Sequence, residues 1–204
     1  MSTQRRRVLE DGGLIIPADG VYIEGLDGKA YTVDKWQSGN TANSVIVASG
    51  DVKFRIALTQ QSSMAIGSSN TDPLENYMTA ISDETAAKAD YNGSVNTANI
   101  IKMQSSTDYA AGYCNAFTFP DGKTKGFLPS LGQLNLAYQN KAAVDAALSK
   151  CGGTAMNTNY YWSSTFWGVN RGYRRCWRLN WSDGNVGYIG SLRSSLYVRP
   201  FAAY

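Results

Sequence analysis

The stretch Phe127-Leu128-Pro129-Ser130-Leu131-Gly132-Gln133-Leu134 decides how the middle of this chain folds. Ser130 is followed three residues later by Gln133, the capping-box pattern with which many helices begin. Apolar residues at helical spacing continue from there until Gly152-Gly153 ends the pattern. Asn140 lies within this region and predicts a break into two helices. The centre of the chain is therefore helical.

Working outward toward the N-terminus, helical character reaches back to Ser82 and then gives way to strands. The segment 107–117 places Ala110, Cys114 and Phe117 on one helix face. Earlier still, short β-rich runs flank turn residues. They predict a hairpin around Asp27-Gly28-Lys29 between strands at 21–23 and 30–33, and two further strands at 44–48 and 52–58.

Strand patterns also follow the central helices. The segment 160–165 predicts one strand, and Trp177, Leu179 and Trp181 alternate with polar residues as in a half-buried strand. The run 197–201 predicts a final strand with Pro200 at an edge or strand end. Strands, then two or three helices, then short antiparallel strands predict an α+β fold.

The length of 204 residues fits a single domain. We expect a flexible arm over residues 1–20 and one domain over 21–204. Arg5, Arg6 and Arg7 begin the chain like a secretory signal, but no apolar segment follows them, so we expect no signal peptide. The arm is either a linker or a basic contact for nucleic acid or a partner.

Several kinds of chemistry are disfavoured by the residue types present. The chain has no histidine, which excludes Ser-His-Asp and Cys-His catalysis and histidine metal sites. Its three cysteines share no CxxC spacing, although a Cys114–Cys151 disulfide stays open. Asp83-Glu84 fits a helix start better than a catalytic carboxylate pair. We expect no enzyme activity, no cofactor, no bound metal and no membrane insertion.

Residues 163–204 have a composition of their own. They contain six arginines and one acid, Asp183, for a net charge of +5, while the remainder carries −2. The same 42 residues contain no Lys, Glu, Gln or Met, all of which are common earlier in the chain. The basic segment is either a solvated face, a contact surface for a protein or glycan, or a nucleic-acid site. No recognised nucleic-acid motif accompanies it, so we expect no nucleic-acid partner.

Five motifs in fixed order resemble the C-type-lectin fold as used by variable proteins of diversity-generating retroelements. They are 127–134, Tyr161-Trp162-Ser163-Ser164-Thr165, Trp177-Arg178-Leu179, Asp183-Gly184-Asn185-Val186 and Tyr197-Val198-Arg199-Pro200-Phe201. In that family a reverse transcriptase copies a template repeat, mutates its adenines and writes the product into the 3′ end of the target gene. Residues 21–60 resemble the β lead-in of members from gut bacteriophages.

The resemblance implies a variable region over 163–201 and explains its composition. An AAC codon randomised at both adenines never encodes Lys, Glu, Gln, Met or Trp. The tryptophans must then be fixed: Trp177 and Trp181 fit the apolar side of a strand, whereas Trp167 has no place in the pattern. Cys176 would be a product of the random mutagenesis, without a chemical role. The diversified, ligand-binding positions would be Val169, Asn170, Arg171, Tyr173, Arg174, Arg175, Arg178, Asn180, Ser182, Asp183, Tyr188, Ile189, Ser191, Arg193, Ser194 and Ser195.

The resemblance therefore implies a hypervariable ligand-binding protein. We expect a bacteriophage tail component, made in the cytoplasm and carried on the virion, that attaches to a protein or glycan on a bacterial surface, with a homotrimer possible. Trp181-Ser182-Asp183 lacks the proline loop of calcium-dependent lectins, so calcium-dependent sugar binding is not expected. The copper-binding cysteine pair of formylglycine-generating oxidases is not matched either. The alternative is a surface or fimbria-associated lectin-like structural module without diversification.

Overall fold

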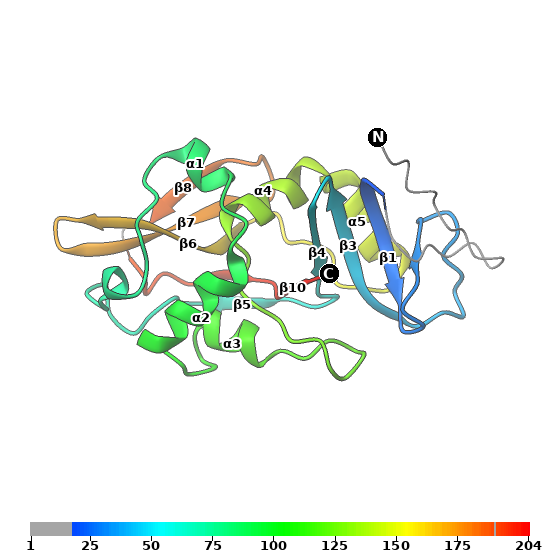
Figure 1. The fold of residues 1–204 in the computed structure, drawn as a ribbon, viewed down its shortest axis with the longest axis horizontal. Helices are drawn as coiled ribbons and strands as arrows, with labels where there is room; N and C mark the ends of the chain where they lie inside the picture. Colours follow the sequence, from blue (N-terminus) through cyan, green and yellow to red (C-terminus); the bar gives the residue numbers. More distant parts are fainter. Residues whose placement is uncertain (1–17, 190) are drawn as a thin grey trace.

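The computed structural model describes residues 18–189 and 191–204, which form an α+β fold with two five-stranded sheets (Figure 1). Sheet A has the strand order β10-β4-β3-β1-β2 and sheet B the order β5-β9-β6-β7-β8. Sheet A comprises β1 (Gly20–Gly25), β2 (Ala30–Tyr31), β3 (Ala42–Ser49), β4 (Val52–Ile56) and β10 (Phe201–Ala203). Sheet B comprises β5 (Gln61–Met64), β6 (Tyr160–Asn170), β7 (Tyr173–Asn180), β8 (Val186–Ile189) and β9 (Leu196–Val198).

The described part of the chain contains five α-helices and one 3-10 helix, more than the two or three predicted. They are η1 (Leu74–Asn76), α1 (Glu84–Lys88), α2 (Gly93–Met103), α3 (Ala110–Ala116), α4 (Leu131–Gln139) and α5 (Lys141–Lys150). The extra ones are short or polar: α1 has five residues, and α2 buries only Gly93, Thr97 and Ile100. Such helices have little apolar periodicity to detect. The predicted break at Asn140 and helix start at Asp83 are confirmed.

The N-terminal hairpin is confirmed, because β1 and β2 pair antiparallel with Ile23 opposite Tyr31. The domain begins slightly earlier than residue 21. Strand β1 starts at Gly20, and the carboxylate of Asp19 accepts a hydrogen bond from the backbone N–H of Gly50 at 2.8 Å. The rest of the predicted arm, residues 1–17, lies outside the described residues.

The predicted final strand 197–201 is wrong in one respect, because it is two strands in different sheets. Strand β9 belongs to sheet B and β10 to sheet A, so the chain crosses between the sheets at Arg199-Pro200. Strand β9 also pairs in parallel with β6, at Tyr197 and Tyr161, so sheet B is mixed and not purely antiparallel. Proline has no N–H for a ladder, which fits a position between two strands.

Arg199 stabilises this crossover from inside the protein. Its side chain is almost completely buried and donates to the carbonyls of Ala57 at 3.0 Å and Thr154 at 2.7 Å, and to Gln60 Oε1 at 2.9 Å. Burial lowers the pKa of the Arg199 guanidinium to about 10. These acceptors come from segments next to both sheets, so one side chain fixes the crossover where they meet.

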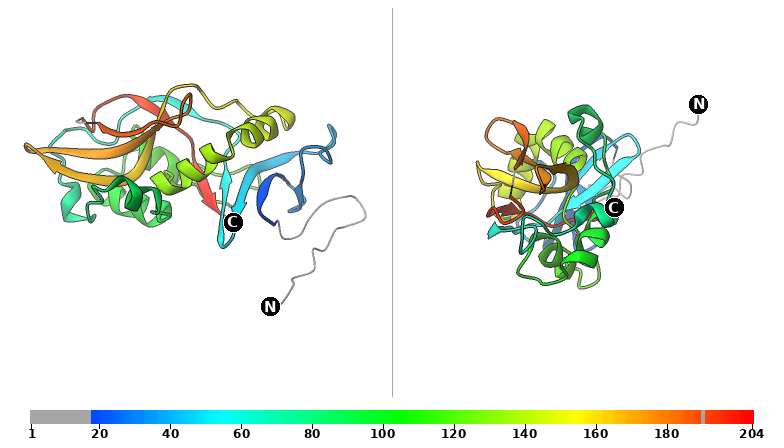
Figure 2. Two further views of the ribbon diagram at one scale, coloured as in Figure 1. Left: turned by 90° about the horizontal axis from the view of Figure 1, so that it is seen from above. Right: turned by 90° about the vertical axis from the view of Figure 1, so that its left-hand side faces the viewer.

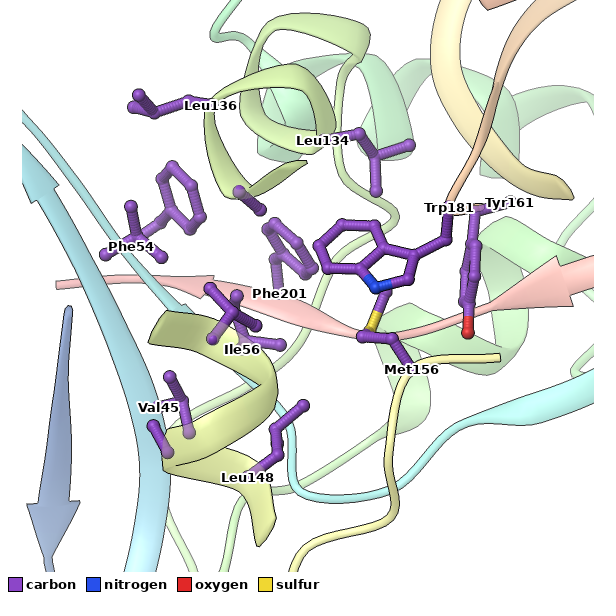
Figure 3. Packing of buried hydrophobic residues seen from close by; sticks show 14 of the residues in the cluster. Val45, Phe54, Ile56, Leu134, Leu136, Leu148, Met156, Tyr161, Trp181 and Phe201 are labelled. Atoms are coloured by element: carbon purple, nitrogen blue, oxygen red, sulfur yellow. The ribbon is translucent and has the colours of Figure 1, made fainter. Parts of the chain in front are cut away.

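The largest core lies between the helices and the two sheets. Helix α5 lies against β1 and β3, and Trp181 fills the space near the junction, beside Tyr161, Leu134 and Met156 (Figure 3). Seen from above, the β6–β7 hairpin extends away from this core to one end of the molecule (Figure 2). The fold thus places four of the six arginines of the basic segment, Arg171, Arg174, Arg175 and Arg178, on a projecting hairpin anchored by buried aromatic residues.

We expect the stability of sheet A to depend on pH through Glu24. Although burial alone would raise its pKa, hydrogen bonds from Arg55, Ser44 and Asn43 lower the pKa of Glu24 below its usual value. A lowered folded pKa means that stability is present above the ordinary pKa of about 4.3 and is lost as pH falls through the folded value. Glu24→Gln should therefore destabilise the protein by about 2 kcal/mol at neutral pH and less in acid.

Urea unfolding at several pH values measures this difference. Glu84→Gln is the matched control, since Glu84 pairs with Lys88 on an exposed helix surface and should change stability little. A Glu24→Gln deficit that stayed constant down to about pH 3 would contradict the assignment.

Candidate ligand-binding surface

The tyrosine-tryptophan-serine motif at the start of β6 is held by a buried polar network. Thr165 Oγ1 donates to the carboxylate of Asp90 at 2.7 Å and accepts from the backbone N–H of Leu131 at 2.9 Å. The side chain of Gln133 accepts from the N–H of Ser130 at 3.0 Å, which completes part of the predicted capping box. The network joins β6 to the start of α4 and to the loop before α2, so β6 is fixed at its root.

A β-bulge explains the position of Trp167. Phe166 lies opposite Cys176, but the next pair is Gly168 with Arg175, so Trp167 has no partner on β7. The extra residue shifts by one position the pattern in which the side chains of β6 alternate between the two faces of the sheet. Trp167 therefore lies on the same side as Arg175, half-buried at the surface, and not in the core with Trp177 and Trp181. Alternation in the sequence cannot reveal such a shift.

Trp167, Tyr188 and Arg175 form a stacked cluster, which we call the arginine platform. The rings of Trp167 and Tyr188 stack with centroids 4.2 Å apart, and the edge of Tyr188 meets Trp177 below. The Arg175 guanidinium lies 5.6 Å from the centre of Trp167 and 5.2 Å from that of Tyr188. These cation–π contacts hold the arginine in one place. The platform is thus a preformed cationic feature supported by a core tryptophan.

Two other arginines of β7 have intramolecular partners. Arg174 forms an ion pair with Glu75, with Nε to Oε2 at 2.8 Å, and this pair raises the pKa of Arg174 and lowers that of Glu75. Arg178 lies over the ring of Tyr160 at 3.8 Å. Neither side chain extends freely into solvent.

None of the sixteen predicted ligand positions is buried, but they do not form one continuous face. Eight are exposed: Val169, Arg171, Tyr173, Ser182, Asp183, Tyr188, Arg193 and Ser195. The other eight are half-buried: Asn170, Arg174, Arg175, Arg178, Asn180, Ile189, Ser191 and Ser194. They lie on the β6–β7 hairpin, on the outer part of β7 and β8, and in the loop before β9.

Some of these positions shape the backbone. Asn180 Oδ1 accepts from the N–H of Ser182 at 3.1 Å, and Asp183 Oδ1 accepts from the N–H of Asn185 at 2.9 Å. Both are turn contacts of the β7–β8 connection. Ser191 Oγ donates to Asn70 Oδ1 at 2.8 Å. Asn180, Asp183 and Ser191 therefore have contacts within the chain, whereas the large exposed side chains among the candidate positions are those of Val169, Arg171, Tyr173, Tyr188 and Arg193.

A segment outside the basic region lines this surface and was not predicted. The carbonyl of Asn70 accepts from the N–H of Arg174, Glu75 pairs with the same residue, and the carbonyl of Ile81 accepts from the indole N–H of Trp177 at 2.7 Å. Residues 70–81 are about a hundred positions away in the sequence. No local pattern could have found them, because their roles depend only on tertiary contacts.

The three cysteines are free in the structure, so the Cys114–Cys151 disulfide left open by the sequence is not formed. Cys176 is fully buried on β7 opposite Phe166, and burial raises the pKa of its thiol to about 12. The side chain packs in the core beneath the hairpin. That retroelement mutagenesis placed a cysteine there stays a prediction.

Thiol reactivity should follow this burial. We expect Cys151, which is half-buried, to react slowly with Ellman's reagent in the native protein, while Cys114 and Cys176 react only after denaturation. All three thiols have a raised pKa because of burial, which keeps the reactive thiolate scarce near neutral pH. Rapid modification of more than one thiol under native conditions would contradict the buried placement.

Among residues 18–189 and 191–204, no group of three or more Cys, Asp or Glu side chains is arranged to hold a metal ion. No helix in this part of the chain is both long and apolar enough to span a membrane.

No protein-family model matches the chain, and no curated protein matches it in sequence. Among solved structures it is similar to a fimbrial protein from Bacteroides ovatus, with a TM-score of 0.60 and 13% sequence identity. The match covers 92% of this chain and 49% of the other, so this chain spans about half the length of the fimbrial protein. At such low identity the likeness shows a shared fold and nothing about function.

Proposed function

We propose that this chain is a non-enzymatic, hypervariable ligand-binding protein with a C-type-lectin fold, diversified by a retroelement. The observation that carries the proposal is the difference in burial between most residues of the expected fixed frame and the sixteen candidate positions. In the frame expected to be fixed, Trp162 to Thr165, Trp177, Leu179, Trp181 and Val198 to Phe201 are buried, whereas none of the sixteen candidate positions is. The frame residues Gly184 to Val186 and Tyr197 are exceptions, because they are half-buried or exposed. Such a division would let surface residues change while the core stays constant.

The turn of the β6–β7 hairpin gives independent support. Arg171 and Gly172 connect Asn170 to Tyr173, and both have positive φ, at 50° and 80°. A two-residue turn with positive φ at both positions strongly favours Asn-Gly. Arginine is a poor choice for the first position, but it is one that adenine mutagenesis of an AAC asparagine codon would produce. Arg171 thus fits a residue produced by adenine mutagenesis at a position where the template encodes asparagine.

We expect Arg171→Asn to stabilise the protein by about 1 kcal/mol, because asparagine tolerates left-handed backbone better than arginine. Thermal or urea unfolding measures the change. Arg193→Asn is a control, since Arg193 is exposed in a loop without positive φ and should change stability little. A neutral or destabilising effect of Arg171→Asn would count against the turn assignment.

Deep sequencing of the 3′ end of this gene across a natural population tests the proposal directly. We expect variation confined to adenine-templated codons between Thr165 and Tyr197, with a near-copy repeat and a reverse transcriptase gene nearby. Uniform sequences without those neighbours would overturn diversification. Within the proposal, the protein is a receptor-binding component of a phage tail, where many copies of a weak contact raise avidity.

A second candidate is a surface or fimbria-associated structural module without diversification. The fold shared with a fimbrial protein favours it, although the identity of 13% supports only the fold. Sibling genes with a constant segment over 163–201 would favour this candidate over the first.

A further inference from the structure

The arginines of the β6–β7 hairpin differ in whether they have an acidic partner. Arg174 is paired with Glu75, whereas the ion pairs among the described residues do not include Arg171, Arg175 or Arg178. The Nε of Arg175 is buried and has no hydrogen-bond partner within the described chain. The hairpin therefore carries three arginines without an acidic partner among the described residues. Arg178 lies over the ring of Tyr160, Arg175 is held by the two rings of the arginine platform, and Arg171 is exposed at the hairpin tip.

Part of the aromatic surface of this region is already covered by contacts within the chain. A sugar ring binds an aromatic side chain through the face of the ring. Trp167 and Tyr188 cover one another's faces at 4.2 Å, and Arg178 covers a face of Tyr160 at 3.8 Å. At the platform, a partner could contact the guanidinium of Arg175 and the exposed part of Tyr188. At the hairpin tip it could contact Arg171 and the exposed Tyr173.

We propose that the hairpin of this particular chain binds an acidic surface of a protein, and this inference rests on the proposed ligand-binding function. The Arg175 guanidinium donates to an Asp or Glu carboxylate of the partner, Arg171 provides a second cation, and the two tyrosines supply the apolar contact. Arginine and tyrosine are enriched at protein–protein interfaces, and a pre-held arginine loses less conformational entropy on binding. Complementary charge determines which partner is accepted.

A library of random dodecapeptides displayed on filamentous phage provides the test, because it needs no knowledge of the natural partner. Peptides are selected on the immobilised full chain, sequenced, and the most enriched one is synthesised for affinity measurements by biolayer interferometry. We expect Asp and Glu to be enriched over the unselected library. We also expect Arg175→Ser to weaken binding about tenfold or more, as loss of a charge-assisted hydrogen bond does.

Three variants make the result specific. Lys123→Ser removes the same charge from an exposed loop that contacts sheet A and should leave binding nearly unchanged. Arg175→Lys keeps the charge but lacks the planar guanidinium group. Its affinity for the selected peptide should lie between those of the wild type and Arg175→Ser. Arg171→Asn should bind more weakly although it is more stable, which separates binding from folding. Thermal melting of each variant shows whether it is folded.

Selected peptides without acidic enrichment, or no selected peptides at all, would overturn the proposal. So would equal weakening by Lys123→Ser, because binding would then reflect only the general positive field. Binding to polygalacturonate with no acidic peptide selected would indicate a glycan partner instead. Gene sequencing separates failure of this inference from failure of the proposed function. If the gene is uniform across the population but acidic peptides are selected, retroelement diversification is overturned and the inference of an acidic partner stands.

Discussion

Trp181→Ala should destabilise the protein by about 3–5 kcal/mol, the largest effect expected of any single side-chain truncation described here. Trp181 is fully buried, and its ring packs edge-on against Tyr138 at 5.6 Å and Tyr161 at 6.3 Å. Figure 3 shows it between Tyr161 and Phe201, where the two sheets and α4 meet. Its removal would leave a cavity bordered by several elements at once, which a local shift cannot close.

Trp167→Ala is the matched control for this prediction. The residue type and the atoms removed are the same, but Trp167 is half-buried at the margin of the core, where its ring stacks on Tyr188 beside Arg175. We expect a loss of about 1 kcal/mol there, from the stacking and cation–π contacts. Urea unfolding of both variants compares them. Equal losses would mean that Trp167 belongs to the core and that the bulge on β6 is misplaced.

Gly132→Ala should also destabilise strongly, by about 1–3 kcal/mol or more, although alanine is the better helix former. A Cβ at this position would lie 2.4 Å from the carbonyl oxygen of Asp90 and 2.9 Å from that of Lys88. Both neighbours are backbone atoms and cannot rotate away. The N–H of Gly132 also donates to the Asp90 carbonyl at 3.1 Å, so separating the two segments would break a hydrogen bond.

Gly39→Ala is the control, because a Cβ there meets no atom within 4 Å and the backbone is not left-handed. Its effect should stay within about 0.5 kcal/mol. Thermal unfolding followed by circular dichroism measures both variants. A stabilised Gly132→Ala would show that helix propensity outweighs the close approach and that α4 does not pack tightly on the loop around Asp90.

The candidate surface was only partly predictable. The sixteen candidate positions were assigned to the surface from a resemblance, and none of them is buried. The pairing of Arg174 with Glu75 and the platform of Arg175 on Trp167 and Tyr188 were not foreseen. These contacts join residues on different strands and loops, and a sequence pattern carries no information about which distant side chain lies beside an arginine.

The sequence by itself determined the features that depend on near neighbours. The hairpin at Asp27-Gly28-Lys29, the helix start at Ser130, the break at Asn140 and the alternation of β7 all follow from local backbone preference and side-chain periodicity. Only the tertiary structure decided that the final segment divides between two sheets at Arg199-Pro200 and that a bulge brings Trp167 to the surface. Those outcomes depend on which distant strands pair and which carbonyls surround a buried guanidinium, and such contacts leave no periodic trace in the chain.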